Sequence, residues 1–233
     1  MIRIGTSGFS FPEWVGPFYP EGVREGAAML GHYASRLDTV EINYTFRRHP
    51  SVKTLETWRQ AVPDAFRFTL KAHQTITHRR RLNDAAEPVA LFAERALTLR
   101  DRLGSVLFQL PPNMKADAER LATFCGVLPD DLRRRAAFEF RHDSWFGDAV
   151  YDVLRAAGCA LVLGETDEYE ARGGATAPLV YVRLRREEYP DERLGRWADR
   201  IKELDAAGHD VLCYLKHDLE APRHALRLRE LLG

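Results

Sequence analysis

Polar and charged side chains stand at alternate positions near the ends of several short apolar segments. In TVEINYTF, Glu41 and Asn43 alternate with apolar residues, and in FRFTLKAH, Lys71 and His73 do the same. In GSVLFQLPP the apolar run is followed by the amide Gln109 near its end. The segment AFEFRH adds Glu139 and Arg141, and the segment VYVRLR adds Tyr181 and Arg183. Carboxylates, a lysine and arginines in one site are suited to proton transfer and to anion binding.

We predict that Glu139, Glu41 and Lys71 are catalytic. Glu139 is the preferred acid or base, and Glu41 is a second carboxylate or the group that orients Lys71. A carboxylate beside cations stays ionised, which suits a base better than an acid. The predicted ligand-binding residues are Asn43, His73, Gln109, Arg141, Tyr181, Arg183 and Trp14. The alternative interpretation is structural, because buried charges also pair simply to hold a barrel together.

The segment GFSFPEWVGPFYPEG, which contains Trp14, is rich in aromatic residues and too long for a simple connection. It is expected to form a lid or a stacking wall, or to pack over one end of the domain. Ser7, just before it, does not occupy a GxSxG nucleophile elbow and is expected to help form a turn.

Histidines and carboxylates near the segment ends raise the question of a metal site. His73, His142 and His217 fit no HxH, HExxH or Cys/His spacing, so no zinc site is predicted. A hard ion such as magnesium or manganese, held by Glu139, Glu165 or Asp218, stays open as a cofactor.

The elements that must position these residues alternate along the whole chain between short strands and longer helices. Eight strands are predicted, at Ile2–Ser7, Thr39–Phe46, Phe66–His73, Ser105–Leu110, Ala136–His142, Ala160–Glu165, Leu179–Arg185 and Val211–His217. Helical periodicity predicts helices at Ala27–Leu37, Val52–Ala61, Leu91–Leu103, Ala116–Leu128, Val150–Ala157, Leu194–Ala207 and His224–Leu232. This order predicts the α/β class and a compact (β/α)8 TIM barrel with an aromatic-rich loop after the first strand.

A doubly wound open sheet is the second choice of fold, but the sequence has no GxGxxG after the first strand and no GKS or GKT loop. In a barrel, alternate side chains point inward. Val40, Ile42, Tyr44 and Phe46 are therefore expected to face the helices, while the polar set faces the interior near the strand ends.

Composition limits the function classes. The 233 residues, taken as a single domain (1–233), carry 34 basic and 34 acidic side chains, so overall charge does not favour a polyanion-binding protein. No segment is apolar enough for a membrane span, and no leader is recognised, so a cytoplasmic protein without a membrane partner is expected. The arginine clusters at 47–48, 79–81 and 185–186 follow strands, and the cluster at 133–135 precedes one.

The motifs GTSGFSFPEWVGPFYP, VEINYTFRRHP, FRFTLKAHQTITHRRRL, LFQLPPN, FEFRHDSW and YVRL occur in order along nearly the whole chain. In these motifs the sequence resembles domain of unknown function 72, the family of YecE-like proteins. The resemblance implies a TIM barrel without an established activity. It also implies that the family's motif positions fall on Thr6, Trp14, Glu41, Asn43, Thr45, Lys71, Thr77, His78, Gln109, Glu139, Arg141, His142, Ser144, Trp145 and Arg183. The chain departs from the family where Arg185-Arg186 replaces His-Gly and where Leu215-Lys216-His217-Asp218 replaces Phe-Asn-Asn-Asp.

Three functions remain open from the sequence. The first is an enzyme, a hydrolase or lyase, acting on a small anionic or sugar-like ligand at the C-terminal mouth of the barrel. The second is nucleic-acid binding or phosphodiester cleavage, as in metal-dependent repair endonucleases that share the barrel, with arginines on phosphates and aromatic rings on bases. The third is a noncatalytic ligand-binding protein. The oligomeric state is not predicted.

Overall fold

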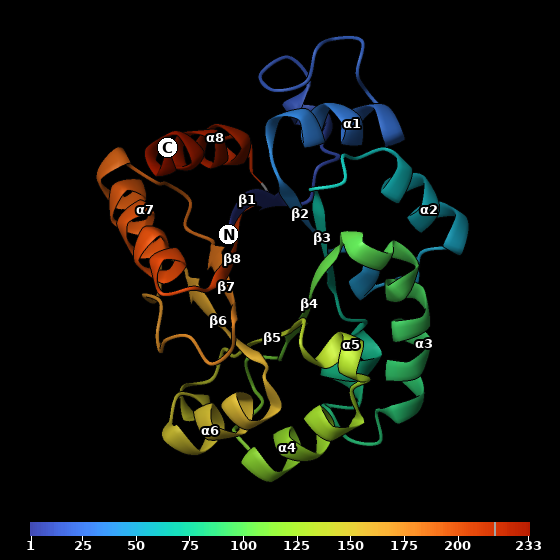
Figure 1. Cartoon of the computed structure of the whole chain (residues 1–233), viewed down its shortest axis with the longest axis vertical. Coiled ribbons are helices and arrows are strands. Elements are labelled where there is room, and N and C mark those ends of the chain that lie inside the picture. The colour runs from blue at the N-terminus through green and yellow to red at the C-terminus, as the bar shows by residue number, and fades with distance from the viewer. Residues whose placement is uncertain (217) are drawn as a thin grey trace.

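The computed structural model of the chain describes residues 1–216 and 218–233. Eight parallel strands pair in sequence order and close into a barrel, and helices surround it (Figure 1). The strands are β1 (Ile2–Ser7), β2 (Thr39–Ile42), β3 (Arg67–Lys71), β4 (Leu103–Gln109), β5 (Ala136–Glu139), β6 (Ala160–Glu165), β7 (Leu179–Leu184) and β8 (Asp210–Leu215). The predicted (β/α)8 TIM barrel is confirmed.

The helices follow the strands on the outside of the barrel. They are α1 (Gly26–Arg36), α2 (Val52–Gln60), α3 (Ala86–Ala96), α4 (Ala118–Val127), α5 (Asp130–Arg133), α6 (Asp148–Ala157), α7 (Asp191–Ala206) and α8 (Ala221–Leu232). Residues 166–178 connect β6 to β7 without a helix. No described helix is long and apolar enough to cross a membrane.

Two apolar regions hold these elements together. The larger lies between the strands and the helices, where the outward side chains of the strands meet the inner faces of the helices. The smaller fills the barrel interior and contains Leu107, Ala137, Ala160, Val162, Ala177, Tyr181, Leu212 and Tyr214. Filled layers of this kind are usual in TIM barrels, which are packed cores rather than pores.

Several strands end earlier than the sequence predicts. The strand expected at Thr39–Phe46 ends at Ile42, because Asn43 adopts helical backbone angles (φ −85°, ψ −18°) and starts a 3-10 helix at Tyr44–Phe46. Thr45 holds this turn against the next strand, since its hydroxyl donates to the carbonyl of Lys71 at 2.7 Å. The prediction that Tyr44 and Phe46 face the helices is therefore wrong, and both line the mouth of the barrel.

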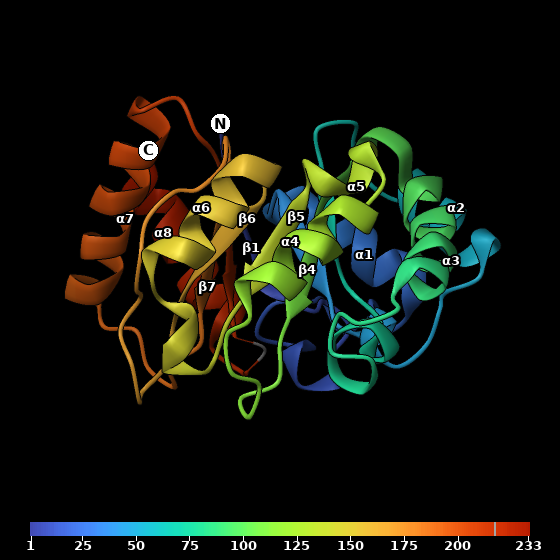
Figure 2. The same ribbon diagram turned by 90° about the horizontal axis from the view of Figure 1, so that it is seen from below.

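Other predicted boundaries shift for the same reason. The strand at Phe66–His73 ends at Lys71, before a π-helix at Thr75–Arg79, and the strand at Ala136–His142 ends at Glu139, before a 3-10 helix at Asp143–Trp145. The final strand, predicted at Val211–His217, ends at Leu215, and His217 lies outside the described residues. In Figure 2 the N-terminus marks one end of the barrel, and the loops that follow the strands lie at the opposite end.

Candidate functional site

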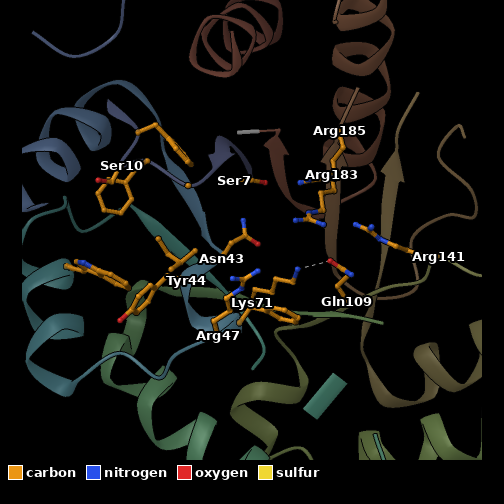
Figure 3. Close-up of a pocket in the computed structure, with 16 residues that line it drawn as sticks. Ser7, Ser10, Asn43, Tyr44, Arg47, Lys71, Gln109, Arg141, Arg183 and Arg185 are labelled. Carbon is orange, nitrogen blue, oxygen red and sulfur yellow. Dashed lines mark hydrogen bonds between the residues drawn. The ribbon is translucent and has the colours of Figure 1, made fainter. Parts of the chain in front are cut away.

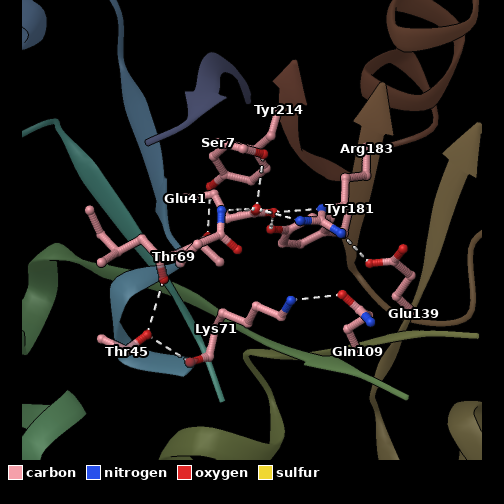
Figure 4. A network of polar contacts seen from close by, with 12 residues as sticks. Ser7, Glu41, Thr45, Thr69, Lys71, Gln109, Glu139, Tyr181, Arg183 and Tyr214 are labelled. Carbon is pink, nitrogen blue, oxygen red and sulfur yellow. Dashed lines mark hydrogen bonds and ion pairs between the residues drawn. The ribbon is translucent and has the colours of Figure 1, made fainter. Parts of the chain in front are cut away.

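A polar layer covers the apolar barrel interior at the C-terminal ends of the strands. Period-two alternation brings one inward residue from each of five strands to this level, and the register places Gln109 directly beside Glu139. The five residues are Glu41 on β2, Lys71 on β3, Gln109 on β4, Glu139 on β5 and Arg183 on β7 (Figure 4).

Arg183 lies at the centre of this layer and bridges both carboxylates. Its Nη2 and Nε donate to the two oxygens of Glu41 at 2.7 Å and 3.0 Å, and its Nη1 donates to Oε2 of Glu139 at 2.6 Å. All three side chains are at most 3% exposed. Burial opposes the charged form of Arg183, but the two carboxylates raise its pKa above the ordinary value.

Glu41 accepts hydrogen bonds from every side. Besides Arg183, it receives the hydroxyl of Ser7 at 2.9 Å, the amide of Asn43 at 3.0 Å and the hydroxyl of Tyr181 at 2.6 Å. Burial by itself raises the pKa of Glu41, but the charge and hydrogen bonds of Arg183 outweigh burial and lower this pKa to about 2. Glu41 is therefore an ionised group whose acceptor positions are occupied.

Glu139 is held in a similar way. Its second oxygen, Oε1, accepts from Nε of Arg141 at 3.2 Å. Burial favours its neutral form, but Arg183 and then Arg141 reverse that effect and hold the pKa of Glu139 below its ordinary value. Both carboxylates thus act as counter-ions to arginines.

Lys71 differs from the other charged residues of the layer because its hydrogen-bond partner is neutral. Its Nζ donates to the amide oxygen of Gln109 at 2.7 Å and lies 4.4 Å from the ring centre of Phe46. Burial, followed by the positive charge of Arg183, lowers the pKa of Lys71 to about 8. The amine is thus partly neutral near physiological pH, as a group that moves protons should be.

A pocket of about 680 Å³ opens above this layer (Figure 3). Its wall contains five cationic side chains and aromatic rings from the first two β-α units. The lining residues are Ser7, Gly8, Phe9, Ser10, Phe11, Ile42, Asn43, Tyr44, Phe46, Arg47, Trp58, Lys71, Gln109, Arg141, Arg183 and Arg185. A volume of this size is typical of sites for small molecules.

Arg185 enters the pocket from the end of β7. Its Nη1 is buried and has no hydrogen-bond partner among the described residues. Burial and then the nearby charge of Arg183 lower the pKa of Arg185. Buried donors are normally paired, so this guanidinium marks a place where an acceptor from a ligand would fit.

The remaining predicted ligand-binding residues lie around the pocket rather than in its wall. Tyr181 is buried below it and donates to Glu41. His73 stacks on His49 with ring centres 4.4 Å apart, and Trp14 is 1% exposed and donates its indole N–H to the carbonyl of Asp218. Tyr181, His73 and Trp14 are thus not among the described residues that line the pocket.

The aromatic-rich loop after β1 contributes rings both to the core and to the pocket wall. Trp14 and Tyr19 pack into the core, whereas Phe9 and Phe11 line the pocket. Ser7 contributes to the polar layer through its bond to Glu41, a role beyond the turn formation expected of it.

The groups considered for a metal are spread apart. Glu165 faces outward from the barrel, where it accepts from the indole of Trp197 at 2.9 Å and pairs with Arg193. Among residues 1–216 and 218–233, no group of three or more His, Cys, Asp or Glu side chains is close enough together to hold a metal ion. The sequence singled out Arg185 only as the end of a predicted strand and as part of a basic cluster, and alternation gave no signal for Phe11 or Trp58, which lie outside the strands.

Comparison with known proteins gives the family. A family model described as protein of unknown function DUF72 matches residues 3–233. The chain belongs to the DUF72 family. The resemblance to YecE-like proteins drawn from the motifs is therefore confirmed, although the family has no established activity.

Solved DUF72 structures share the whole architecture. The crystal structure of a DUF72 protein from Thermotoga maritima superposes with a TM-score of 0.83 at 26% identity, covering 100% of this chain and 99% of that one. A second, from Enterococcus faecalis, superposes with a TM-score of 0.80 at 20% identity, covering 100% and 97%, and so shows the fold.

One named relative matches over a shorter stretch. The UPF0759 protein YunF of Bacillus subtilis (strain 168) is 29% identical over 160 residues, which are 65% of this chain. The match spans only 55% of the length of YunF.

Proposed function

We propose that this DUF72 protein is an enzyme, a hydrolase or lyase, that acts on a small anionic molecule bound in the mouth pocket. The observation that carries the proposal is the buried Nη1 of Arg185, which has no hydrogen-bond partner among residues 1–216 and 218–233 and lies in a pocket lined by four other cationic side chains. A buried guanidinium donor without an acceptor is costly, and a carboxylate or phosphate oxygen would satisfy it.

The pairing of charges supports the same assignment. Arg183 donates to Glu41 and Glu139, and Arg141 donates to Glu139, so two arginines balance the two carboxylates beneath the pocket. Lys71, hydrogen-bonded to the neutral Gln109, and Arg185 keep their positive charge available for a ligand. The pocket is cationic although the whole chain has a formal charge of zero.

Lys71 is the group best placed to move a proton. Its lowered pKa, about 8, lets the neutral amine accept a proton from the substrate or from an attacking water, and the resulting ammonium can return it. The sequence predicts Glu139 as the acid or base and Glu41 as a second carboxylate or the group that orients Lys71, but the oxygens of both accept from arginine, hydroxyl or amide donors. These contacts favour a positioning role for both carboxylates in the proposed reaction.

A thermal-shift screen tests binding. Sugar phosphates, carboxylates and nucleotides would each be added with and without magnesium or manganese, and a ligand at a hundredfold excess over its Kd stabilises by about 2.7 kcal/mol. We expect a shift with a subset of anions, reduced in Arg185→Gln and in Lys71→Met. Arg134→Gln, on the opposite end of the barrel, is the matched control and should keep the full shift. A panel without any shift, or shifts that are undiminished in both pocket variants, would refute the proposal.

Catalysis is tested on the anions that bind. Proton and phosphorus NMR spectra of each bound anion would be followed with time, and we expect one to be consumed by the wild type and left unchanged by Lys71→Met. Specific binding without consumption of any bound anion would favour the noncatalytic ligand-binding alternative.

Nucleic-acid binding stays a prediction from the sequence. Its support is Arg47 at the pocket rim and the neighbouring Tyr44, which is 52% exposed. Salt separates it from the main proposal, because affinity for an oligonucleotide falls steeply with ionic strength when several phosphates are contacted. Binding of a pocketed small anion should weaken far less over the same range.

A further inference from the structure

We infer that the ligand of the mouth pocket carries a planar ring as well as its anionic group. The inference rests on the proposed function and names the class of substrate more narrowly. It follows from a division of the pocket into two halves, an aromatic half formed by Phe11, Tyr44 and Trp58 and a cationic half formed by Lys71, Arg141 and Arg185.

The two halves come from different parts of the barrel. The aromatic residues belong to the loop after β1, the turn after β2 and helix α2, whereas the cations belong to β3 and to the segments that follow β5 and β7. Figure 3 shows Tyr44 and Ser10 on one side of the pocket and Arg141 and Arg185 on the other. Phe46, against Lys71, and Arg47, after the turn of Tyr44, place one group of the other kind in each half. One ligand that filled the pocket would still meet the three rings at one end and the three cations at the other.

The aromatic half has the character of a binding surface rather than of core. Tyr44 is 52% exposed, although large apolar rings are usually covered. Trp58 stacks nearly parallel on Phe68, with ring centres 6.2 Å apart and planes 20° apart, and also lines the pocket. A ring held against the core at a fixed orientation is a preorganised platform for stacking.

Gly8 shapes the same half. Its φ is +102°, and a Cβ at this position would come within 2.6 Å of the ring of Phe11. The ring of Phe11 thus lies directly against the backbone of the loop, and it also contacts Trp14 with ring centres 4.8 Å apart. Its position at the pocket wall is consequently fixed by neighbours on two sides.

The size of the pocket agrees with a two-part ligand. An inorganic anion bound by Lys71 and Arg185 would leave most of the 680 Å³ unfilled. Lys71 and Arg185 are also partly buried, although Arg141 is exposed, whereas binding to a polymer backbone relies on many exposed cations. Both observations favour a small ring-bearing anion over a nucleic-acid strand.

The test compares anions that differ only by a ring. Isothermal titration of the full chain would measure Kd for AMP and ribose 5-phosphate, phenyl phosphate and inorganic phosphate, and benzoate and acetate. We expect the ring-bearing member of at least one pair to bind tenfold or more tightly, which corresponds to about 1.4 kcal/mol. Tyr44→Ala and Trp58→Leu should remove that advantage while leaving the Kd of the ring-free member unchanged.

A matched control uses Tyr151→Ala, which removes a half-buried tyrosine of α6 outside the pocket and should keep the advantage. Quenching of tryptophan fluorescence on binding, lost in Trp58→Leu, gives a second readout, since Trp14, Trp145 and Trp197 are buried.

The outcomes separate this inference from the proposed function. Equal affinity within every pair, or binding of ring-free anions alone, overturns the inference and leaves anion binding standing. Absence of binding by every anion overturns both. Tight binding of a single-stranded oligonucleotide, with none of the six small anions bound, also overturns both and favours a nucleic-acid ligand.

Discussion

Replacement of Arg183 by methionine tests whether this residue is the electrostatic centre of the barrel mouth. The wild-type guanidinium makes hydrogen bonds of 2.6–3.0 Å to Glu41 and Glu139, and all three side chains are buried. Arg183→Met keeps much of the side-chain volume but leaves two buried carboxylates without their shared cation. Removing one partner of a buried ion pair costs about 3–5 kcal/mol.

The expected fall in Tm follows from this cost. For a chain of this size, 1 kcal/mol corresponds to about 2–4 °C, so Arg183→Met should melt roughly 6–20 °C below the wild type near neutral pH. Glu139→Gln should lower Tm less, because its amide oxygen can still accept from Arg183. Circular dichroism melts of the three proteins, with matched spectra at low temperature to show folding, provide the comparison.

The difference in Tm between the wild type and Arg183→Met should depend on pH. In the wild type the pKa of Glu41, about 2, lies below its ordinary value of 4.5, so its stabilisation is present above about pH 4.5 and is lost as pH falls from there. In Arg183→Met, burial without the cation should raise the pKa of both carboxylates above the ordinary value. Ionisation then destabilises the variant as pH rises, so the gap in Tm should narrow from about pH 8 to about pH 5.

Two results would refute this reasoning. One is a Tm for Arg183→Met within 2 °C of the wild type, and the other is a gap that stays constant with pH. As an internal control, the triple variant Arg183→Met, Glu41→Gln, Glu139→Gln should recover part of the lost stability, because neutral amides no longer need a cation.

Two further predictions concern the pocket. Because the pKa of Lys71 is about 8, its positive charge is lost as pH rises through that value. The affinity for a bound anion should therefore fall between about pH 7 and pH 9 in the wild type and change less over this range in Lys71→Met. Titration calorimetry across this range measures both profiles, and identical profiles would count against Lys71 as an anion ligand. Gly8→Ala should cost about 1–2 kcal/mol, because Gly8 has a positive φ, and should displace the ring of Phe11. The variant should lose affinity for a ring-bearing anion more than for its ring-free partner, and equal losses would remove Phe11 from the aromatic half.

Sequence alternation identified the polar layer because its period is purely geometric. Within a strand of known direction, every second residue faces the interior, so Glu41, Lys71, Glu139 and Arg183 could be placed together from the sequence. Because carboxylates that face the interior are buried, the sequence also predicts that they pair with cations. It could not choose among Lys71, Arg141 and Arg183 as the main partner, because that choice depends on side-chain reach across the barrel.

The part of the site beyond the strand ends was harder to predict. At Asn43 the chain leaves the extended conformation, and from that residue the period-two rule assigns the wrong face to Tyr44 and Phe46. Arg185 stands one residue after β7, within a basic cluster that looks the same as the solvated clusters elsewhere. A strand end is set by the loss of a hydrogen-bonded neighbour, which involves residues distant in sequence.

The positive charge of the pocket arises because strands and the segments after them supply different charged residues. The strands supply both carboxylates and Arg183, and Arg141 after β5 balances the second carboxylate. Lys71 on β3 and Arg185 after β7 then add positive charge, and the described residues of the pocket wall include no further carboxylate to match it. A neutral protein thereby acquires a cationic mouth through local imbalance rather than net charge. The imbalance lies beside rings from the first two β-α units, so the arrangement is complementary to a molecule with its negative charge at one end.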